Sequence, residues 1–202
     1  MAVVLDPALN AEETPRRVRF TRDAFDHLLN LGAFAGQRFE LINGDLIAKM
    51  GQHPPHAYAL NLLMRYLVHL FGIERIRCQS PIEVADVDRE YSYPEPDLVV
   101  MSAANREYAL RHPHGTEITL LVEVADTISH FDRTVKSDLY ARAGVPEYWV
   151  LDVSRRLLYV YRHPVNGQYS SLVKTTPAES VSPEAMPEAA RVVSDLLPPL
   201  NG

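Results

Sequence analysis

The sequence lacks most of the features that would place the protein in a membrane or in an oxidising compartment. It has 1 cysteine, Cys78, so no disulfide can form within the chain, and a cytoplasmic location is the expectation. No apolar run approaches the roughly 18 residues that a membrane-spanning helix needs. The first residues lack the basic segment and the long apolar core of a secretory signal, so we expect neither export nor a membrane partner.

Basic charge is scarce as well. The 20 lysines and arginines are outnumbered by 26 aspartates and glutamates, and the formal net charge is -6. This balance argues against a protein that coats nucleic acid in general, but it leaves a nuclease open, because metal ions offset the acids of such a site. A local basic stripe could hold phosphates, although a solvated charged face is the simpler explanation. The two candidate stripes are Arg16, Arg17, Arg19 and Arg22, and Arg75 with Arg77.

Two further kinds of site leave no pattern in the sequence. The histidines at 53, 112, 114 and 130 do not have the spacing of zinc ligands. No glycine-rich loop is present that would cradle the phosphates of a nucleotide. We therefore expect no zinc centre and no organic cofactor.

The length and the order of the elements indicate one α/β (α+β) domain. With 202 residues, 47% of them hydrophobic, the chain can bury a proper core. We expect a flexible arm over residues 1–17, the domain over 18–175, and a Pro/Ala/Glu-rich tail over 176–202 whose packing on the core stays open.

Hydrophobic spacing and turn residues predict the individual elements. Thr21 is a typical helix N-cap, Asn43-Gly44 and Asn166-Gly167 are typical of tight hairpin turns, and the segment 53–56, with its two prolines, predicts a break in the chain. The predicted helices are one after Thr21 that buries Ala24, Phe25, Leu28 and Leu29, one over 57–71 ended by Gly72, and one over 127–143 capped by Thr127 or Ser129 and ended by Gly144. The predicted strands are a hairpin over 39–47, single strands over 75–84, 98–101, 118–125 and 148–153, and a hairpin of 156–162 with 169–174; residues 102–116 form a loop or a short helix.

Two acids in apolar strands are the most informative residues. Asp97 opens the strand over 98–101, and Glu123 lies inside the strand over 118–125. An ionised carboxylate is costly to bury, and two of them on neighbouring strands repel each other unless a divalent cation compensates them. Mg²⁺ binds through one or two carboxylates plus phosphate oxygens, Mn²⁺ can replace it, and the carbonyl of Val124 could add a ligand. This arrangement is typical of metal-assisted phosphodiester hydrolysis, although Asp97 could also merely stabilise the turn after Pro96.

A row of three polar side chains follows in the next predicted helix. Asp132, Lys136 and Tyr140 are each four residues apart, so they share one face of that helix. Ala125 lies on the same face of its strand as Glu123 and leaves space for the Lys136 ammonium. There Lys136 would orient the attacking water and stabilise charge on the phosphate, with a general-base role less favoured. The simpler alternative is a surface ion pair between Lys136 and Asp132.

Several segments together resemble a known family. They are Glu40-Leu-Ile-Asn-Gly44, His56, Pro96-Asp97, Glu123-Val124, the row of Asp132, Lys136 and Tyr140, and the run Gly144-Val-Pro-Glu-Tyr-Trp-Val-Leu-Asp152. Over roughly residues 18 to 175 the chain resembles the Uma-two family of restriction endonucleases in the PD-(D/E)XK nuclease superfamily.

The resemblance implies a restriction-endonuclease-like core, with a mixed central β-sheet flanked by helices, and Mg²⁺-dependent cleavage of DNA. It implies that Asp97 and Glu123 bind the metal, that Lys136 is the catalytic lysine relocated to the helix, and that Glu40 is an additional acid. For Glu40 a role at the start of a hairpin is an equal alternative, and His56 could simply cap a helix or bind a phosphate, with the structural role favoured. One departure is visible, because Ala125 stands where the superfamily's E-x-K tripeptide has its lysine.

Other functions stay open at this point. The chain could be a catalytically silent module with a nuclease fold that binds DNA or a partner protein. A hydrolase of a nucleotide or other small phosphate ester is a third hypothesis, which would need a closed pocket. A homodimer is expected for the enzyme, because both strands of a duplex must be cut and two-fold assemblies are the commonest oligomers.

Overall fold

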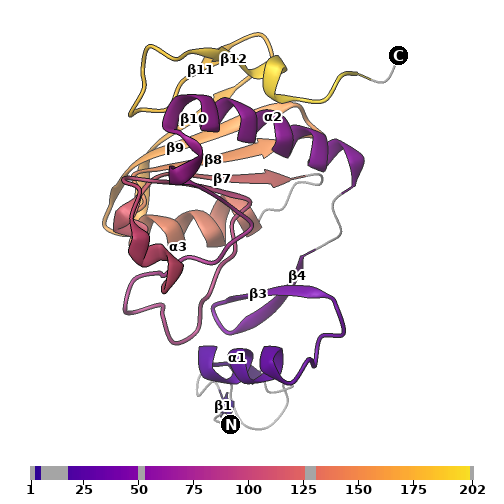
Figure 1. The fold of residues 1–202 in the computed structure, drawn as a ribbon, viewed down its shortest axis with the longest axis vertical. Helices are drawn as coiled ribbons and strands as arrows, with labels where there is room; N and C mark the ends of the chain where they lie inside the picture. Colours follow the sequence, from indigo (N-terminus) through magenta and orange to yellow (C-terminus); the bar gives the residue numbers. More distant parts are fainter. Residues whose placement is uncertain (1–2, 6–17, 50–52, 126–130, 201–202) are drawn as a thin grey trace, which may run out of the picture.

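The computed structural model describes residues 3–5, 18–49, 53–125 and 131–200, and it confirms a mixed α+β architecture. Six strands form the central sheet, which helix α2 (Pro54–Phe71) covers on one face and helix α3 (Ser137–Arg142) on the other (Figure 1). The hairpin of β3 (Arg38–Ile42) and β4 (Asp45–Lys49) lies on the α3 side of this sheet, next to α1 (Arg22–Asn30). No helix within the described ranges combines the length and the apolar character that crossing a membrane requires.

The central sheet mixes one parallel pair with antiparallel pairs. Its order is β10-β9-β8-β7-β6-β5, in which β7 and β8 run parallel and every other neighbouring pair runs antiparallel. The bounds are β5 (Ile76–Cys78), β6 (Leu98–Met101), β7 (Ile118–Ala125), β8 (Glu147–Asp152), β9 (Leu157–Val165) and β10 (Gln168–Thr175).

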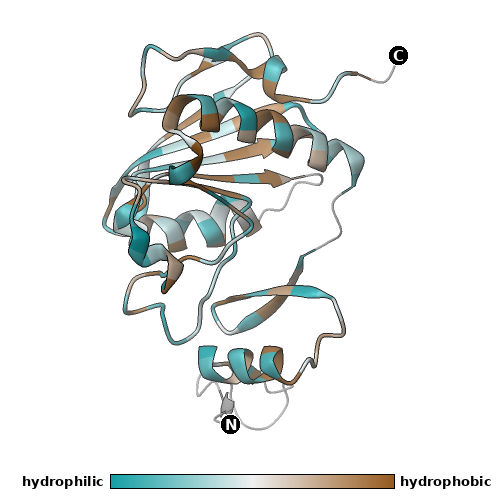
Figure 2. Ribbon diagram, in the orientation of Figure 1, coloured by the Kyte–Doolittle hydropathy of each residue, from teal (hydrophilic) through white to brown (hydrophobic). Residues whose placement is uncertain are grey.

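Side-chain alternation along β7 divides the core into two layers. Leu120, Val122 and Val124 pack in the layer under α2, whereas Leu121 and Ala125 pack in the layer with α3. Figure 2 shows hydrophobic colouring along these central strands and a mixture of hydrophobic and hydrophilic residues along α2. Because Glu123 has the parity of Leu121, the sheet directs its carboxylate toward the α3 side.

The helix α2 begins three residues earlier than the sequence predicts. His53 is its N-cap residue, and Pro54 and Pro55 occupy its first positions, where the missing N–H would have no partner in any case. The expected break over 53–56 is therefore wrong, and His56 lies in the first turn of the helix. The predicted end is confirmed: Gly72, with φ of 80°, follows Phe71.

The predicted strand over 75–84 is also shorter in the structure. The short helix η1 (Ile73–Arg75) precedes β5, and β5 ends at Cys78. Gln79 has a positive φ of 47° and Pro81 has no N–H to donate, so the ladder cannot continue. Ile82 and Val84 are nevertheless buried, in the layer with α3.

The turn residues behave as predicted. Thr21 accepts a hydrogen bond from the Ala24 amide at 3.2 Å and caps α1, although Leu29 is 44% exposed and not part of a buried face. Asn43 and Gly44 have φ of 49° and 82°, and Asn166 and Gly167 have φ of 52° and 80°, so both hairpins close through left-handed pairs. The segment between β6 and β7 contains the short helices η2 (Arg106–Ala109) and η3 (Gly115–Glu117).

The predicted helix over 127–143 appears in two parts. The π-helical turn η4 (Asp132–Lys136) leads into α3, and Gly144, with φ of 83°, ends it as expected. Its two candidate caps, at 127 and 129, lie outside the described residues.

The two ends of the chain form small sheets of their own. β1 (Val3–Leu5) pairs with β2 (Val18–Phe20), and residues 6–17 of the expected arm lie outside the described part. Near the C-terminus β11 (Ser180–Val181) pairs with β12 (Arg191–Val192), and η5 (Val193–Leu196) follows. Val193, Leu196 and Leu197 pack in the layer under α2.

Gly115 marks a close approach between η3 and the end of α3. A Cβ at this position would lie 2.7 Å from the Cβ of Ala143 and would also overlap the Ala143 carbonyl oxygen. We expect Gly115→Ala to lower the free energy of unfolding by about 1–3 kcal/mol, because backbone must move to accept the methyl group. Urea denaturation checks this value. Gly32→Ala is the control, since its Cβ meets open space and only its φ of 68° is unfavourable; an equal or larger loss at Gly32 would contradict the expectation.

Candidate active site

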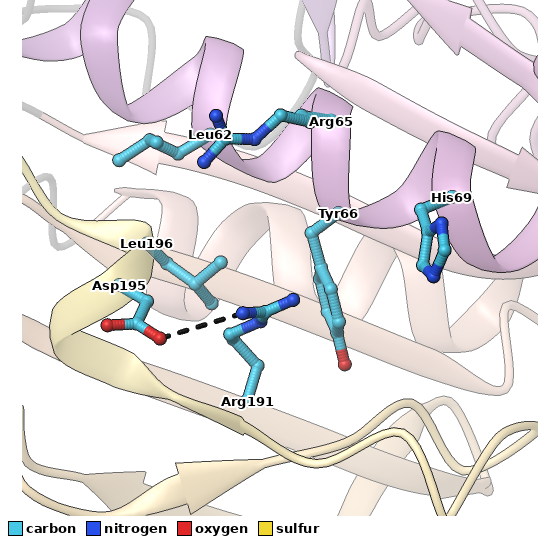
Figure 3. Close-up of a pocket in the computed structure, with 7 residues that line it drawn as sticks. All are labelled: Leu62, Arg65, Tyr66, His69, Arg191, Asp195 and Leu196. Carbon is cyan, nitrogen blue, oxygen red and sulfur yellow. Dashed lines mark ion pairs between the residues drawn. The ribbon is translucent and has the colours of Figure 1, made fainter.

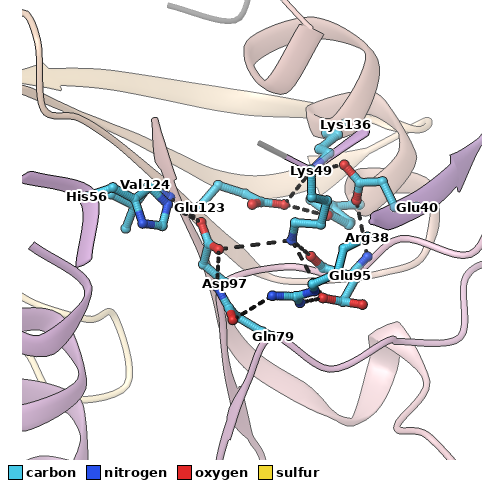
Figure 4. Close-up of polar contacts among 11 residues, drawn as sticks. Arg38, Glu40, Lys49, His56, Gln79, Glu95, Asp97, Glu123, Val124 and Lys136 are labelled. Carbon is cyan, nitrogen blue, oxygen red and sulfur yellow. Dashed lines mark hydrogen bonds and ion pairs between the residues drawn. The ribbon is translucent and has the colours of Figure 1, made fainter. Parts of the chain in front are cut away.

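Asp97 lies at the start of β6 and is almost completely buried (4% exposed). Its Oδ2 accepts a hydrogen bond from the Val124 amide at 2.9 Å and lies 3.4 Å from His56 Nε2 (Figure 4). Its Oδ1 lies 3.4 Å from Gln79 Nε2 and 4.0 Å from Lys49 Nζ. Burial alone raises the pKa of Asp97, but the bond to His56, the Lys49 ammonium and the Val124 amide together hold it below its ordinary value. Asp97 is therefore held as an ionised carboxylate.

Glu123 is on the neighbouring strand β7 and is equally buried (4% exposed). Its Oε1 accepts hydrogen bonds from Lys136 Nζ and from the Tyr140 hydroxyl, both at 2.9 Å. Burial raises the pKa of Glu123 above its ordinary value; the Lys136 ammonium opposes this, and the Asp97 carboxylate adds to it. The net direction is upward, so the positive charge around Glu123 does not fully compensate its burial.

Lys136 joins Glu123 to a third acid. Its ammonium lies 2.7 Å from Glu40 Oε1 and 2.9 Å from Glu123 Oε1, and the whole side chain is buried. The other Glu40 oxygen, Oε2, accepts from the Glu95 amide at 3.2 Å. The ammonium thus reaches the Glu123 side chain from the α3 side of the sheet, as the small Ala125 predicts. Lys136 is buried and does not lie on the surface, and the alternative of an ion pair with Asp132 stays a prediction.

Sequence reasoning missed three charged residues beside these acids. Lys49 ends β4, donates to the Glu95 carbonyl and lies 3.9 Å from Glu95 Oε1, while Arg38 forms an ion pair with the same carboxylate. Two signals could have found them: Lys49 is one of only three lysines, and Glu95 precedes Asp97 by two residues. Arg38 pairs with Lys49 across the hairpin, so the β3–β4 unit supplies both cations.

The remaining predicted site residues have mixed outcomes. His56 and Tyr140 contact Asp97 and Glu123 directly, as given above. The amide of Val124 contacts Asp97, and the role of its carbonyl as a metal ligand stays a prediction. Asp132 begins η4, but its side chain lies outside the described residues.

The predicted basic stripes are mostly engaged in structural contacts. Arg16 and Arg17 lie outside the described residues. The other arginines bind protein groups: Arg19 Nε donates to Asn43 O at 3.0 Å, Arg22 Nη2 to Glu83 Oε1 at 2.7 Å, Arg75 Nε to Met101 O at 2.7 Å, and Arg77 to Tyr108 O. These partly buried arginines form structural contacts within the protein, so neither a solvated charged face nor a phosphate-binding stripe describes them.

The acid cluster has donors that suit a hard divalent cation. Four carboxylates, those of Glu40, Glu95, Asp97 and Glu123, face three basic side chains, so the cluster keeps a formal negative charge if His56 is neutral. All four offer oxygen, the donor that Mg²⁺ and Mn²⁺ prefer. Among the residues that the structure describes, no three His, Cys, Asp or Glu side chains form a ready cage for a metal. The residues fit an ion that takes two carboxylates, Asp97 and Glu123, and completes its coordination with water or phosphate oxygens.

Two comparisons with known proteins identify the family and the fold. The model of the family Uma2, described as "Putative restriction endonuclease", matches residues 23–194. A solved structure described as "a putative nuclease belonging to DUF820 from Anabaena variabilis" has a TM-score of 0.63 and 17% sequence identity, and the match covers 78% of this chain and 88% of that one. At this identity the likeness shows a shared fold. No curated protein matches the chain.

Proposed function

We propose, from the premise that this chain belongs to the Uma2 family of restriction endonucleases, that it is a Mg²⁺-dependent DNA endonuclease. One observation carries the proposal: Asp97 and Glu123, buried on adjacent strands, meet in one cluster with a buried lysine. Such a cluster adds little to the stability of a protein core, because every ionised group in it must be desolvated. Chemistry that needs those charges explains the cluster better than a gain in stability does.

The side chains divide the work in this proposal. Asp97 and Glu123 would hold the cation, which when bound supplies Lewis acidity and lowers the pKa of a water. The His56 imidazole and the Val124 amide fix the orientation of Asp97, and Tyr140 fixes that of Glu123. Lys136 would hold the attacking water and stabilise negative charge on the phosphate, while Glu40 keeps its ammonium in place.

A catalytically silent module that binds DNA or a partner protein is the second candidate. Ala125 replaces the lysine of the E-x-K tripeptide, and Lys136 forms ion pairs with two acids, which could hold it away from a substrate. Calorimetry with Mn²⁺ separates the two candidates, since the module requires no metal and the enzyme must bind it through Asp97.

We expect the purified protein to cleave supercoiled plasmid in Mg²⁺ or Mn²⁺ and to lose this activity completely in chelator, because the cation supplies both the nucleophile and charge stabilisation. Linear duplex and single-stranded DNA, tested in parallel, define the substrate. Full linearisation without accumulated nicks would support the proposed homodimer, since two sites then act on the two strands. Absence of cleavage in every metal, with no Mn²⁺ binding, would favour the silent module.

A further inference from the structure

A recess lies between α2 and the C-terminal segment and shares no residue with the acid cluster (Figure 3). Its volume is about 460 Å³, which is within the range of small-ligand pockets, roughly 300–1,000 Å³. One side of the recess is a single face of α2, because the α2 residues that line the recess are spaced as residues on one helix face are. The residues that line the recess are Leu62, Arg65, Tyr66 and His69 from α2, and Arg191, Asp195 and Leu196 from β12 and η5.

The two arginines come from the two sides of this recess. Arg65 extends from α2, and Arg191 reaches from β12 so that its Cζ lies 5.5 Å from the centre of the Tyr66 ring (Figure 3). The Tyr66 hydroxyl donates to the Ala189 carbonyl at 2.6 Å, and this bond joins the helix to the segment that carries Arg191. The position of the second arginine relative to the first is thereby held by the fold.

The recess contains little negative charge that could neutralise these cations. Arg65 and His69 have neither an ion pair nor a hydrogen bond from their side chains to any residue that the structure describes, and neither is buried. Arg191 lies 3.7 Å from Asp195, but their side chains are 46% and 54% exposed, and such surface pairs are weak. In a chain with a net charge of -6, this is a local basic site whose guanidinium groups are available to a ligand.

We infer that this recess binds the phosphate group of a nucleotide. Guanidinium groups present paired N–H donors that match two phosphate oxygens, and arginine is preferred over lysine for this recognition. Leu62 is partly exposed in the recess and offers an aliphatic surface against which a sugar can pack, whereas Tyr66 and Leu196 are buried. The site is separate from the proposed metal site, and its occupation does not depend on cleavage.

Isothermal titration calorimetry tests the inference with three probes: dAMP, deoxyadenosine, and a single-stranded oligonucleotide that has no terminal phosphate. Chelator is present throughout, so that phosphate cannot bind through a metal at the acid cluster. We expect at least one phosphate-bearing probe to bind and deoxyadenosine not to bind. Arg65→Ala combined with Arg191→Ala should weaken this binding about 10-fold or more, because two charge-assisted hydrogen-bonding groups are lost.

The probe that binds identifies the source of the phosphate. Binding of dAMP indicates a free nucleotide, and binding of the oligonucleotide alone indicates a polynucleotide backbone; each supports the inference if the double variant weakens it. Arg106→Ala is the matched control, because Arg106 is an exposed arginine of η2 and does not line the recess. Thermal unfolding verifies that the double variant is folded, and Arg65→Glu, at an exposed position, gives a second measurement. The inference is overturned if neither dAMP nor the oligonucleotide binds, or if the parent and both variants bind with equal affinity.

Discussion

Asp97→Asn and Glu123→Gln are each expected to lower the rate of DNA cleavage by more than about 100-fold, because substitutions merely adjacent to metal ligands already cost about 10–100-fold. Both changes keep the size of the side chain and one acceptor oxygen but remove the charge that would hold a cation. Glu123→Gln can still accept from Lys136 and Tyr140, so the packing around it should persist. Plasmid cleavage in Mg²⁺ measures the rate, and calorimetry with Mn²⁺ measures the accompanying loss of binding.

The exposed acid Asp86 provides the matched control. Asp86→Asn makes the same chemical change away from the cluster and should leave both cleavage and metal affinity unchanged. If Asp97→Asn and Glu123→Gln cut DNA as fast as the parent protein does, these residues are not the metal ligands, and the proposed site must be abandoned.

Lys136→Met is expected to have the largest effect on stability. The side chain of Lys136 is buried between Glu40 and Glu123, and removing one partner of a buried ion pair leaves uncompensated charge, at a cost of about 3–5 kcal/mol. Burial already holds the pKa of Glu123 above its ordinary value against the lowering effect of Lys136. Without the ammonium, the pKa of Glu123 in the folded state rises further.

The sign of the pH dependence follows from that rise. A carboxyl whose pKa is higher in the folded than in the unfolded state stabilises the fold at low pH, and this contribution is lost as the pH increases. The deficit of Lys136→Met relative to the parent should therefore be larger at about pH 8 than at about pH 5. Urea denaturation at both pH values measures it.

Two controls accompany the Lys136 variant. Lys174→Met changes an exposed lysine of β10 and should alter stability little at either pH. Added Mn²⁺ should restore more stability to Lys136→Met than to the parent, because the cation replaces the missing positive charge. A deficit that is independent of pH and insensitive to Mn²⁺ would indicate lost packing in place of lost charge compensation.

Features that depend on a few neighbouring residues were predictable. The pairs Asn43-Gly44 and Asn166-Gly167 adopt positive φ wherever they stand between strands, and Thr21 can cap only the turn that follows it. The central strands were also predictable, because a continuous apolar run has no stable place except inside the sheet. Two local signals gave wrong bounds. The prolines begin α2 and do not break the chain, and β5 ends before Gln79.

The chemistry of the cluster was predictable only in part. A carboxylate in the run Leu121-Val-Glu-Val must find a partner when it is buried, and this requirement pointed to Glu123, to Asp97 on a neighbouring strand and to a lysine in reach. Nothing in that reasoning specifies contacts made by residues far apart in the chain. Lys49 and Arg38 reach Asp97 and Glu95 only because the β3–β4 hairpin lies on the α3 side of the central sheet.

The amino-acid sequence by itself determined the turns, the apolar strands and the need to compensate two buried acids, because each follows from local backbone preference or from the cost of desolvation. The three-dimensional packing determined which cations meet those acids, where His56 points, and that Arg65 faces Arg191 across a recess. These pairings join segments separated by tens of residues, and their geometry depends on how helices and sheets dock. Docking is set by the summed burial of many side chains, which no single motif records.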